Sequence, residues 1–492
     1  MYFLYSKELK SIFAGVTIHI YKSFTVHTVK MGFLKAIGQF LPEVKKPSGK
    51  LPFKTRIGWT LGILLIFFVL SVIPVWGVSS SSDTAFAQLE LLLGASIGSI
   101  ITLGIGPIVT ASIVLQLLNG AGFLKFDTAS DSGRKEFATA QKLVTLFFIL
   151  FEAIIFTVFG VISAERGAAN FAQMQFAIVV QLILGALAIM FMDEIISKWG
   201  FGSGISLFIA AGVSKEIFIR AFSPLHANGG EGYIGAVWEL FRSLSIGNTT
   251  GALLAASAII ATLVVFLVVV YVQAMKVEIP LSFGRVRGHG MRWPLQFLYT
   301  SNMPVILMAA LLANVQLLSR LLSGRFGWDW MGVFPQGAQS ATSGLAYYLQ
   351  APRLLEITLT GGFTWHVLAA ALIYTTFLVL GSVMFSFFWV QTVGLDARSQ
   401  AKKIMQSGLQ VPGFRNDPRV LESILGRYIM PLTIMGGLTI GLLAAGADLM
   451  GTLSSGTGLL LAVMIIYQLY ETIAREQMYD MNPMVRKFLG KN

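Results

Sequence analysis

Cysteine is absent from the 492 residues, and histidine occurs only five times. Without cysteine the chain has no disulfide framework, no thiolate metal site and no cysteine nucleophile. The zinc-protease pattern H-E-x-x-H and the nucleotide-binding pattern G-x-x-x-x-G-K-[ST] do not occur either. The histidines are scattered along the sequence, as individual structural or solvated residues are. We therefore predict a protein that is not an enzyme and that binds neither a metal ion nor a cofactor.

Charged side chains are also scarce. Only 12% of the residues are charged, 55% are hydrophobic and the mean hydropathy is +0.72. A water-soluble domain carries about a quarter charged residues. A chain this apolar cannot cover its own surface with polar groups, so part of that surface must contact lipid. The composition excludes a soluble enzyme and predicts a multispan, all-α membrane protein.

Long apolar runs recur along the chain. A helix that crosses a bilayer needs about 20 mostly apolar residues, and ten segments approach this length. The fifth is the weakest, because it is rich in glycine and serine and ends in Lys215-Glu216. The predicted spans are 57–78, 99–118, 140–163, 172–195, 203–222, 251–275, 294–322, 364–392, 428–447 and 455–474.

The basic residues indicate the orientation of these spans. When the spans alternate, 29 of the 36 lysines and arginines fall on the side of the termini and 7 on the other side. Basic residues are enriched in cytosolic loops. We therefore predict a multi-pass cell-membrane protein with both termini in the cytosol.

The spans divide the chain into two halves. A cytosolic segment, 1–56, precedes them. Met31 opens a more natural start, so the first thirty residues are either a real extension or the result of an upstream start-codon assignment. The first half is 57–222, an external loop covers 223–250, and the second half is 251–474, followed by a cytosolic tail, 475–492. The second half contains two basic cytosolic loops, 276–293 and 394–427. The outer loops 223–250 and 323–363 are Gly-rich and aromatic, which suits short helices on the membrane surface.

The segment after the first span is too short to cross the membrane again. Residues 84–93 form a ten-residue apolar run that contains Gln88 and Glu90. Half-spanning backbone at membrane depth is stable only inside protein or beside a water-filled cavity. Two alternatives follow from the residues, a helix that lies at the interface and a re-entrant segment that plugs a cavity.

Several longer strings carry a family resemblance. Residues 101–111 read ITLGIGPIVTA, and residues 193–212 read DEIISKWGFGSGISLFIAAG. Shorter strings follow in order at 277–281, 301–306, 413–415 and 456–458. Together they closely resemble the SecY family of archaeal and eukaryotic type, over essentially everything from Met31 to the end. The resemblance implies ten spans in two inverted five-helix halves around a central hourglass pore, with a short plug helix.

The resemblance also implies an aliphatic ring at the constriction of that pore. A narrow apolar neck offers ions and water no hydrogen-bond partners, so it can gate by dewetting. Each residue alone is more often a helix-packing residue, and the assignment depends on the shared motifs. The ring would consist of Ile105, Val109, Ile205, Ile209, Ile306 and Leu461, with Met303 nearby at a position where isoleucine is common in the family.

The plug implied by the resemblance covers residues 84–96. Ser96 stands where family members often carry an arginine, so an electrostatic latch at that position is not expected. The plug residues that we single out are Thr84, Phe86, Leu89, Leu92 and Ser96.

Glu152 is the acidic residue that lies deepest in a predicted span. A charge at the bilayer centre costs about 2.5–3.5 kcal/mol on insertion scales, so this side chain should face protein or water. The resemblance implies that Glu152, Thr110 and Asn302 form a polar cluster across a lateral gate. A neutral, hydrogen-bonded structural carboxylic acid is the alternative.

Three arginines match family positions that dock the translating ribosome, namely Arg285, Arg287 and Arg415. RNA is a polyanion, so projecting guanidinium groups suit such a surface. Ordinary basic residues of cytosolic loops are the alternative interpretation.

The function implied by the resemblance is that of the central channel subunit of a protein translocase. Such a channel conducts unfolded secretory polypeptides and releases transmembrane segments laterally into lipid. The implied partners are a SecE-like subunit and a small β subunit in a heterotrimer, the ribosome, signal sequences and nascent chains. Two other classes of membrane protein are alternatives. A secondary transporter needs intramembrane polar or charged residues for its substrate and coupling ion, and an intramembrane enzyme needs paired catalytic groups.

Overall fold

The computed structural model describes most of the chain, and some of the predicted site residues lie outside the described part. The described residues are 43–49, 51–78, 98–120, 123–124, 126, 131–159, 161–162, 164, 170–226, 232–283, 290–335, 341–406, 409–410 and 418–481. The predicted residues outside them are the N-terminal thirty and Thr84, Phe86, Leu89, Leu92, Ser96, Arg285, Arg287 and Arg415.

Ten helices of the described chain correspond in order to the ten predicted spans. Those of the first half are α3 (Phe53–Val72), α5 (Gly106–Gly120), α6 (Asp131–Val158), α7 (Phe171–Trp199) and α8 (Gly204–Phe222). Those of the second half are α10 (Thr249–Ala274), α11 (Met303–Phe326), α14 (Trp365–Val393), α16 (Pro418–Leu449) and α17 (Gly456–Met481).

Eight of these helices are long and apolar enough to cross a membrane, within the described ranges. The two others have identifiable reasons for falling short. Helix α5 has only 15 residues, and α8 carries Lys215, Glu216 and Arg220 within its 19 residues. The prediction of a multispan helical membrane protein is confirmed.

Two of the predicted spans begin later than expected. Residues 98–105 form turns, and α5 starts only at Gly106. Gly104 has a φ of 54°, a left-handed conformation that glycine adopts without strain, and Pro107 has no N–H to continue a helix backwards. The seventh span was predicted from residue 294, whereas α11 starts at Met303 because residues 290–296 belong to a strand.

The two basic loops meet in a small sheet that we did not predict. Strand β1 (Lys276–Phe283) pairs antiparallel with β2 (Gly290–Gln296), and with the short β3 (Leu409–Gln410) from the second loop. Helix α15 (Ala397–Gln406) lies between α14 and β3. The all-α description therefore applies to the spans, and the loops add a three-stranded sheet.

The loops 223–250 and 323–363 contain short helices. They are α9 (Ala236–Ile246) in the first loop, and α12 (Leu345–Tyr348) and α13 (Leu354–Leu359) in the second. Glu239 lies in the first turn of α9. Burial raises the pKa of this carboxyl group. Hydrogen bonds from the Tyr233 N–H and the Ser243 hydroxyl, together with the positive charge of Arg242, lower the pKa by more, so that it lies below its usual value.

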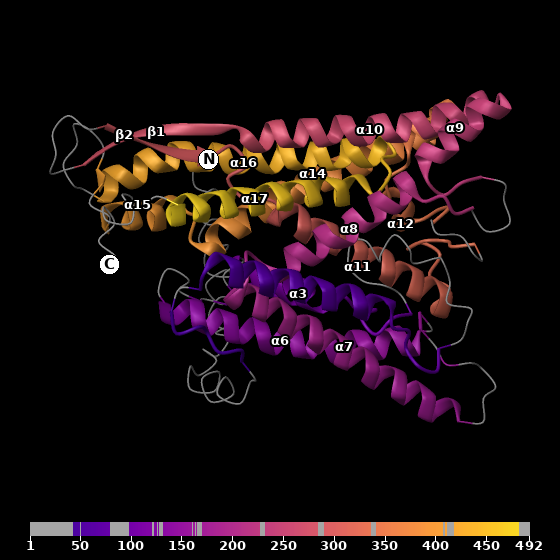
Figure 1. Cartoon of the computed structure of the whole chain (residues 1–492), viewed down its shortest axis with the longest axis horizontal. Helices are drawn as coiled ribbons and strands as arrows, with labels where there is room; N and C mark the ends of the chain where they lie inside the picture. The colour runs from indigo at the N-terminus through magenta and orange to yellow at the C-terminus, as the bar shows by residue number, and fades with distance from the viewer. Residues whose placement is uncertain are drawn as a thin grey trace, which may run out of the picture.

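Figure 1 shows how the two halves are arranged. Helices α3, α6 and α7 gather on one side, helices α10, α14, α16 and α17 gather on the other, and α8 and α11 lie between them. We call the end that carries β1, β2 and α15 the sheet end, and the end that carries α9 and α12 the α9 end (Figure 1). Helix α8 packs against α17, and α5 packs against α11 and α14, and these helix pairs join the two halves.

Gly185 in α7 provides a test of this packing. A Cβ atom there would lie 1.9 Å from the backbone oxygen of Ile100, which belongs to the turns before α5. We expect Gly185→Ala to destabilise the protein by about 1–3 kcal/mol or more, because backbone must move to admit it. The thermal unfolding midpoint in detergent is the measurement.

The matched control is Gly212→Ala in α8, where a Cβ atom would meet nothing within 4 Å. Alanine in an open helical position should stabilise by about 0.5–1 kcal/mol. Equal unfolding midpoints for the two variants would contradict the close approach of α7 to Ile100.

Candidate functional site

The predicted ring residues lie near the first turns of four helices. Ile105 and Val109 flank the start of α5, and Ile205 and Ile209 lie in the first turns of α8. Met303 and Ile306 lie in the first turn of α11, and Leu461 is the sixth residue of α17. Helix α17 runs toward the sheet end, whereas α8 and α11 run toward the α9 end (Figure 1). Four helix starts that approach from opposite ends of the bundle therefore carry the candidate ring.

The structure brings these side chains into one apolar cluster. Five of them are almost fully buried in the largest core cluster, and the other two pack against it. The buried five are Ile105, Val109, Ile209, Ile306 and Leu461, and the partly buried two are Ile205 and Met303. The local environment is aliphatic, as a dewetting neck requires.

A buried carboxylate from the preceding helix caps the start of α8. The Ile205 N–H donates to the Asp193 Oδ1 over 2.9 Å, and the Gly204 N–H also bonds this carboxyl. Asp193 lies in α7, six residues before its end. The first N–H groups of a helix have no acceptor within the helix. The Asp193 carboxylate supplies an acceptor for them across the connection between α7 and α8.

The start of α17 is capped in the same way from the end of α16. The Thr457 N–H donates to Asp448 Oδ1 over 3.0 Å, and the Tyr374 hydroxyl donates to Asp448 Oδ2 over 2.7 Å. The Thr457 hydroxyl also donates to Oδ2, and the Gly456 N–H bonds the carboxyl. Asp448 therefore joins α14, α16 and α17.

Thr110 and Glu152 of the predicted polar cluster are hydrogen-bonded, but the asparagine beside them is a different one. The Asn314 Nδ2 donates to the Thr110 Oγ1 over 3.1 Å, which links α11 to α5. Glu152 of α6 forms a side-chain hydrogen bond with Thr110. Thr110 also donates to the Gly106 carbonyl in its own helix. The cluster thus comprises Thr110, Glu152 and Asn314 and spans three helices.

The prediction of Asn302 as a member of this cluster is wrong. Asn302 precedes Asn314 by twelve residues, which is about 18 Å along a helix. Its Oδ1 accepts a bond from the Ser301 hydroxyl, which itself accepts one from Gln468 of α17. Its Nδ2 is buried without a partner in the part of the chain that the structure describes. Asn302 therefore belongs to a second polar group beside the ring.

The two segments that flank the predicted plug, one before it and one after it, lie side by side. The Val75 N–H donates to the Gly98 carbonyl over 2.8 Å, and the Ile100 N–H donates to the Ile73 carbonyl over 3.0 Å. The chain thus leaves the end of α3 and returns to the same place before α5. This is the path that a re-entrant segment needs.

The sheet is tied to a ring helix by a carboxylate. Glu471 of α17 accepts bonds from Lys276 of β1 and Gln296 of β2, each over 3.1 Å. Behind the sheet, the Tyr299 hydroxyl donates to the Leu395 carbonyl over 2.7 Å. Burial, together with the nearby Asp396 carboxylate, raises the pKa of Tyr299 above its usual value, so the phenol stays a donor.

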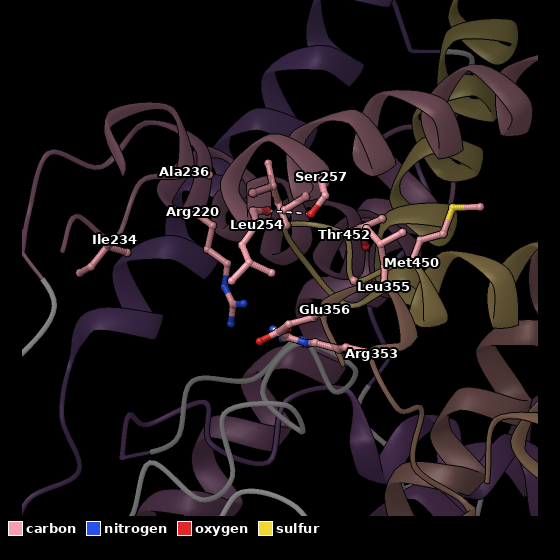
Figure 2. Close-up of a pocket in the computed structure, with 13 residues that line it drawn as sticks. Arg220, Ile234, Ala236, Leu254, Ser257, Arg353, Leu355, Glu356, Met450 and Thr452 are labelled. Atoms are coloured by element: carbon pink, nitrogen blue, oxygen red, sulfur yellow. Dashed lines mark hydrogen bonds and ion pairs between the residues drawn. The ribbon is translucent and has the colours of Figure 1, made fainter. Parts of the chain in front are cut away.

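A polar pocket of about 240 Å³ lies at the α9 end, away from the ring. Figure 2 shows Arg220, Arg353 and Glu356 converging on it. Each guanidinium group is paired there, Arg220 with Glu216 over 2.7 Å and Arg353 with Glu356 over 3.3 Å. Because neighbouring carboxylates compensate both positive charges, we place the functional site at the ring and not at this pocket.

The residues that sequence reasoning missed are Asn314, Asp193 and Asp448. Asn314 had a visible signal, since it is an amide within an apolar stretch of α11. Asp193 and Asp448 each precede a glycine at a helix start, Gly204 and Gly456. The carboxylate precedes the glycine by eleven residues in one case and by eight in the other, so no common spacing signals the caps.

Comparisons with known proteins agree with this architecture. The SecY family matches residues 99–470, and the plug domain of Sec61p matches residues 65–98. A protein translocase subunit SecY from Methanothermobacter thermautotrophicus is 43% identical over 455 residues, which are 92% of this chain and 97% of the relative. The same subunit from Methanocaldococcus jannaschii is 38% identical over 454 residues, with 92% and 98% covered.

Solved structures give the same result. A protein-conducting channel superimposes with a TM-score of 0.77 at 38% identity, over 90% of this chain and 97% of that chain. Sec61 in a canine ribosome–channel complex from the endoplasmic reticulum gives a TM-score of 0.74 at 37% identity, with the same two coverages. Because these proteins are channels for polypeptides, a secondary transporter is not favoured.

Proposed function

Since the chain belongs to the SecY family, it is a channel subunit of a protein translocase, and we propose that its aliphatic ring seals the resting channel. The function is conduction of polypeptides, and the family is not one of enzymes. The convergence of the ring residues from four helix starts into one apolar cluster supports the seal. Resting ion conductance of ring variants in planar bilayers is the measurement that tests it.

Residues 84–96 would add a second barrier as a removable plug. The match of residues 65–98 to a plug domain supports this assignment, as does the adjacency of Val75 and Gly98 at its two ends. A segment whose ends are held together can move as a unit without displacing α3 or α5.

The lateral gate would lie where α5 meets α11 and α14. A hydrogen bond between Thr110 and Asn314 crosses this contact between the two halves. Opening there would release transmembrane segments into lipid. The hydrogen bond between Thr110 and Asn314 would be present in the closed gate and broken in the open one. The helices that part would be those of different halves, as a clamshell requires.

The sheet end would face the cytosol of a cell membrane, with both termini on that side. The excess of basic residues in the segments at this end supports this orientation. A SecE-like subunit and a small β subunit would complete a heterotrimer. The ribosome would dock on the basic loops, and the similar Sec61 channel occurs in a canine ribosome–channel complex.

Replacing Arg285, Arg287 and Arg415 with glutamate should weaken ribosome binding. The two loops that hold these arginines are joined through the β1–β3 pairing. Each lost contact to a phosphate should reduce the affinity. It should also reduce the slope with which the logarithm of the affinity falls with the logarithm of the salt concentration. Co-sedimentation with ribosomes across a salt titration is the measurement.

A charge reversal at Arg353, on the α9 end, is the control and should leave ribosome affinity unchanged. The docking proposal fails if the triple variant binds ribosomes as the unaltered channel does at every salt concentration.

A further inference from the structure

Two carboxylates at the ends of α7 and α16 have the same geometry. Asp193 binds the first N–H groups of α8, and Asp448 binds the first N–H groups of α17. In each half, the fourth spanning helix thus caps the fifth. The α7–α8 connection approaches from the sheet end and the α16–α17 connection from the α9 end (Figure 1), so one arrangement occurs twice in opposite directions.

A glycine at each helix start makes this contact possible. A Cβ atom at Gly204 would lie 2.6 Å from the Asp193 Cα, and one at Gly456 would lie 2.0 Å from the Ala447 carbonyl carbon. Both helix starts therefore pack directly on the backbone that carries the carboxylate. Two features therefore fix where each helix begins, the carboxylate that accepts its first N–H groups and the glycine whose lack of a side chain allows the close approach.

Each cap is connected to a ring residue within one turn. Ile205, a ring residue, itself donates the N–H that Asp193 accepts. Leu461 follows Thr457 by four residues, so the two lie on the same face of α17. A shift of either helix start would move an aliphatic side chain at the neck.

We infer that Asp193 and Asp448 are positioning residues that hold the ring side chains of α8 and α17 at the constriction. The inference rests on the proposed ring. It states that two acidic residues outside the ring hold its side chains in place. Asp448 has more partners, because Tyr374 and the Thr457 hydroxyl also bind it. Its replacement should therefore have the larger effect.

Hydrogen exchange measures the caps directly, on the purified channel complex in lipid nanodiscs. In Asp193→Leu we expect amide exchange in residues 204–209 to accelerate about tenfold or more, since the capped donors lose their acceptor. Asp448→Leu should have this effect on residues 456–461. The Asp→Asn variants keep an acceptor oxygen and should exchange nearly as the unaltered protein does.

Tyr374→Phe is a milder variant that retains the carboxylate and covers the case in which a leucine variant does not fold. It should accelerate exchange in residues 456–461 by about twofold to tenfold, the effect of one lost hydrogen bond, and leave residues 204–209 unchanged. Resting ion conductance is recorded for every variant in parallel.

Local acceleration at the capped helix start, with exchange in the middle of α7 unchanged, upholds the inference. Unchanged exchange at both helix starts, or acceleration spread evenly over the protein, overturns it. If exchange accelerates locally while the channel stays silent, the carboxylates still position these turns, and the result counts against the proposed seal instead.

Discussion

A channel in which Ile105, Ile205 and Ile306 are all replaced by serine is expected to conduct ions at rest. These residues come from α5, α8 and α11, so the change affects three sides of the proposed neck at once. Serine hydroxyls bind water, and the smaller side chains widen the neck, so the free-energy barrier to wetting falls. A barrier lowered by about 1.4 kcal/mol raises ion passage tenfold, and three substitutions should exceed that. Single-channel recording in planar bilayers is the measurement.

The control must separate leakage from general damage to the core. Ile178, Ile189 and Ile196 of α7 are fully buried and lie outside the ring. Their replacement by serine should lower the unfolding temperature, since each large-to-small change in a core costs about 2–5 kcal/mol, but leave the folded channel silent. A ring variant that folds and stays silent would show that these side chains do not form the seal.

The spans were predictable because they depend on length and hydropathy alone. Each of the ten apolar runs became a helix of the described chain, since a membrane forces the backbone to satisfy its own hydrogen bonds. Their starts were less predictable. Residues 99–105 are as apolar as a helix needs to be, yet tertiary contacts hold them in turns, with Ile100 bonded to Ile73 and packed on Gly185.

The polar partners were predictable only in part. Sequence strings placed Thr110 and Glu152 correctly in one cluster. Which of the two asparagines, Asn302 or Asn314, contacts Thr110 depends on the axial position of α11 relative to α5. No local sequence pattern encodes that position. The two caps were invisible for a similar reason, because each joins a carboxylate and an N–H across a helix connection. Such pairs follow from the packing of whole helices.

Asn314→Leu is expected to lower the hydrophobicity that a segment needs in order to leave the channel laterally. The change keeps the size of the side chain but removes the hydrogen bond from Asn314 to Thr110, which links α11 to α5 across the proposed gate. Such a bond contributes about 0.5–1.5 kcal/mol. The ratio of lateral release to full translocation should therefore rise roughly twofold to tenfold at a fixed hydrophobicity. A graded series of signal anchors measures this ratio.

Asn302→Leu is the matched control on the same helix. The Asn302 Nδ2 has no partner within the described residues, so removing it loses no bond across the gate. We expect its anchor series to follow that of the unaltered channel. The opposite result, with Asn302→Leu shifted and Asn314→Leu unchanged, would contradict the cluster seen in the structure.

A double-mutant cycle with Thr110→Val identifies the cause of the shift. If Asn314 acts through its bond to Thr110, the double variant should release anchors no more readily than the stronger single variant, because both changes remove the same bond. Additive effects would mean that the two side chains act separately. In that case Glu152, the other partner of Thr110, would be the residue that holds α6 and α5 together, and the gate would not depend on α11 through this contact.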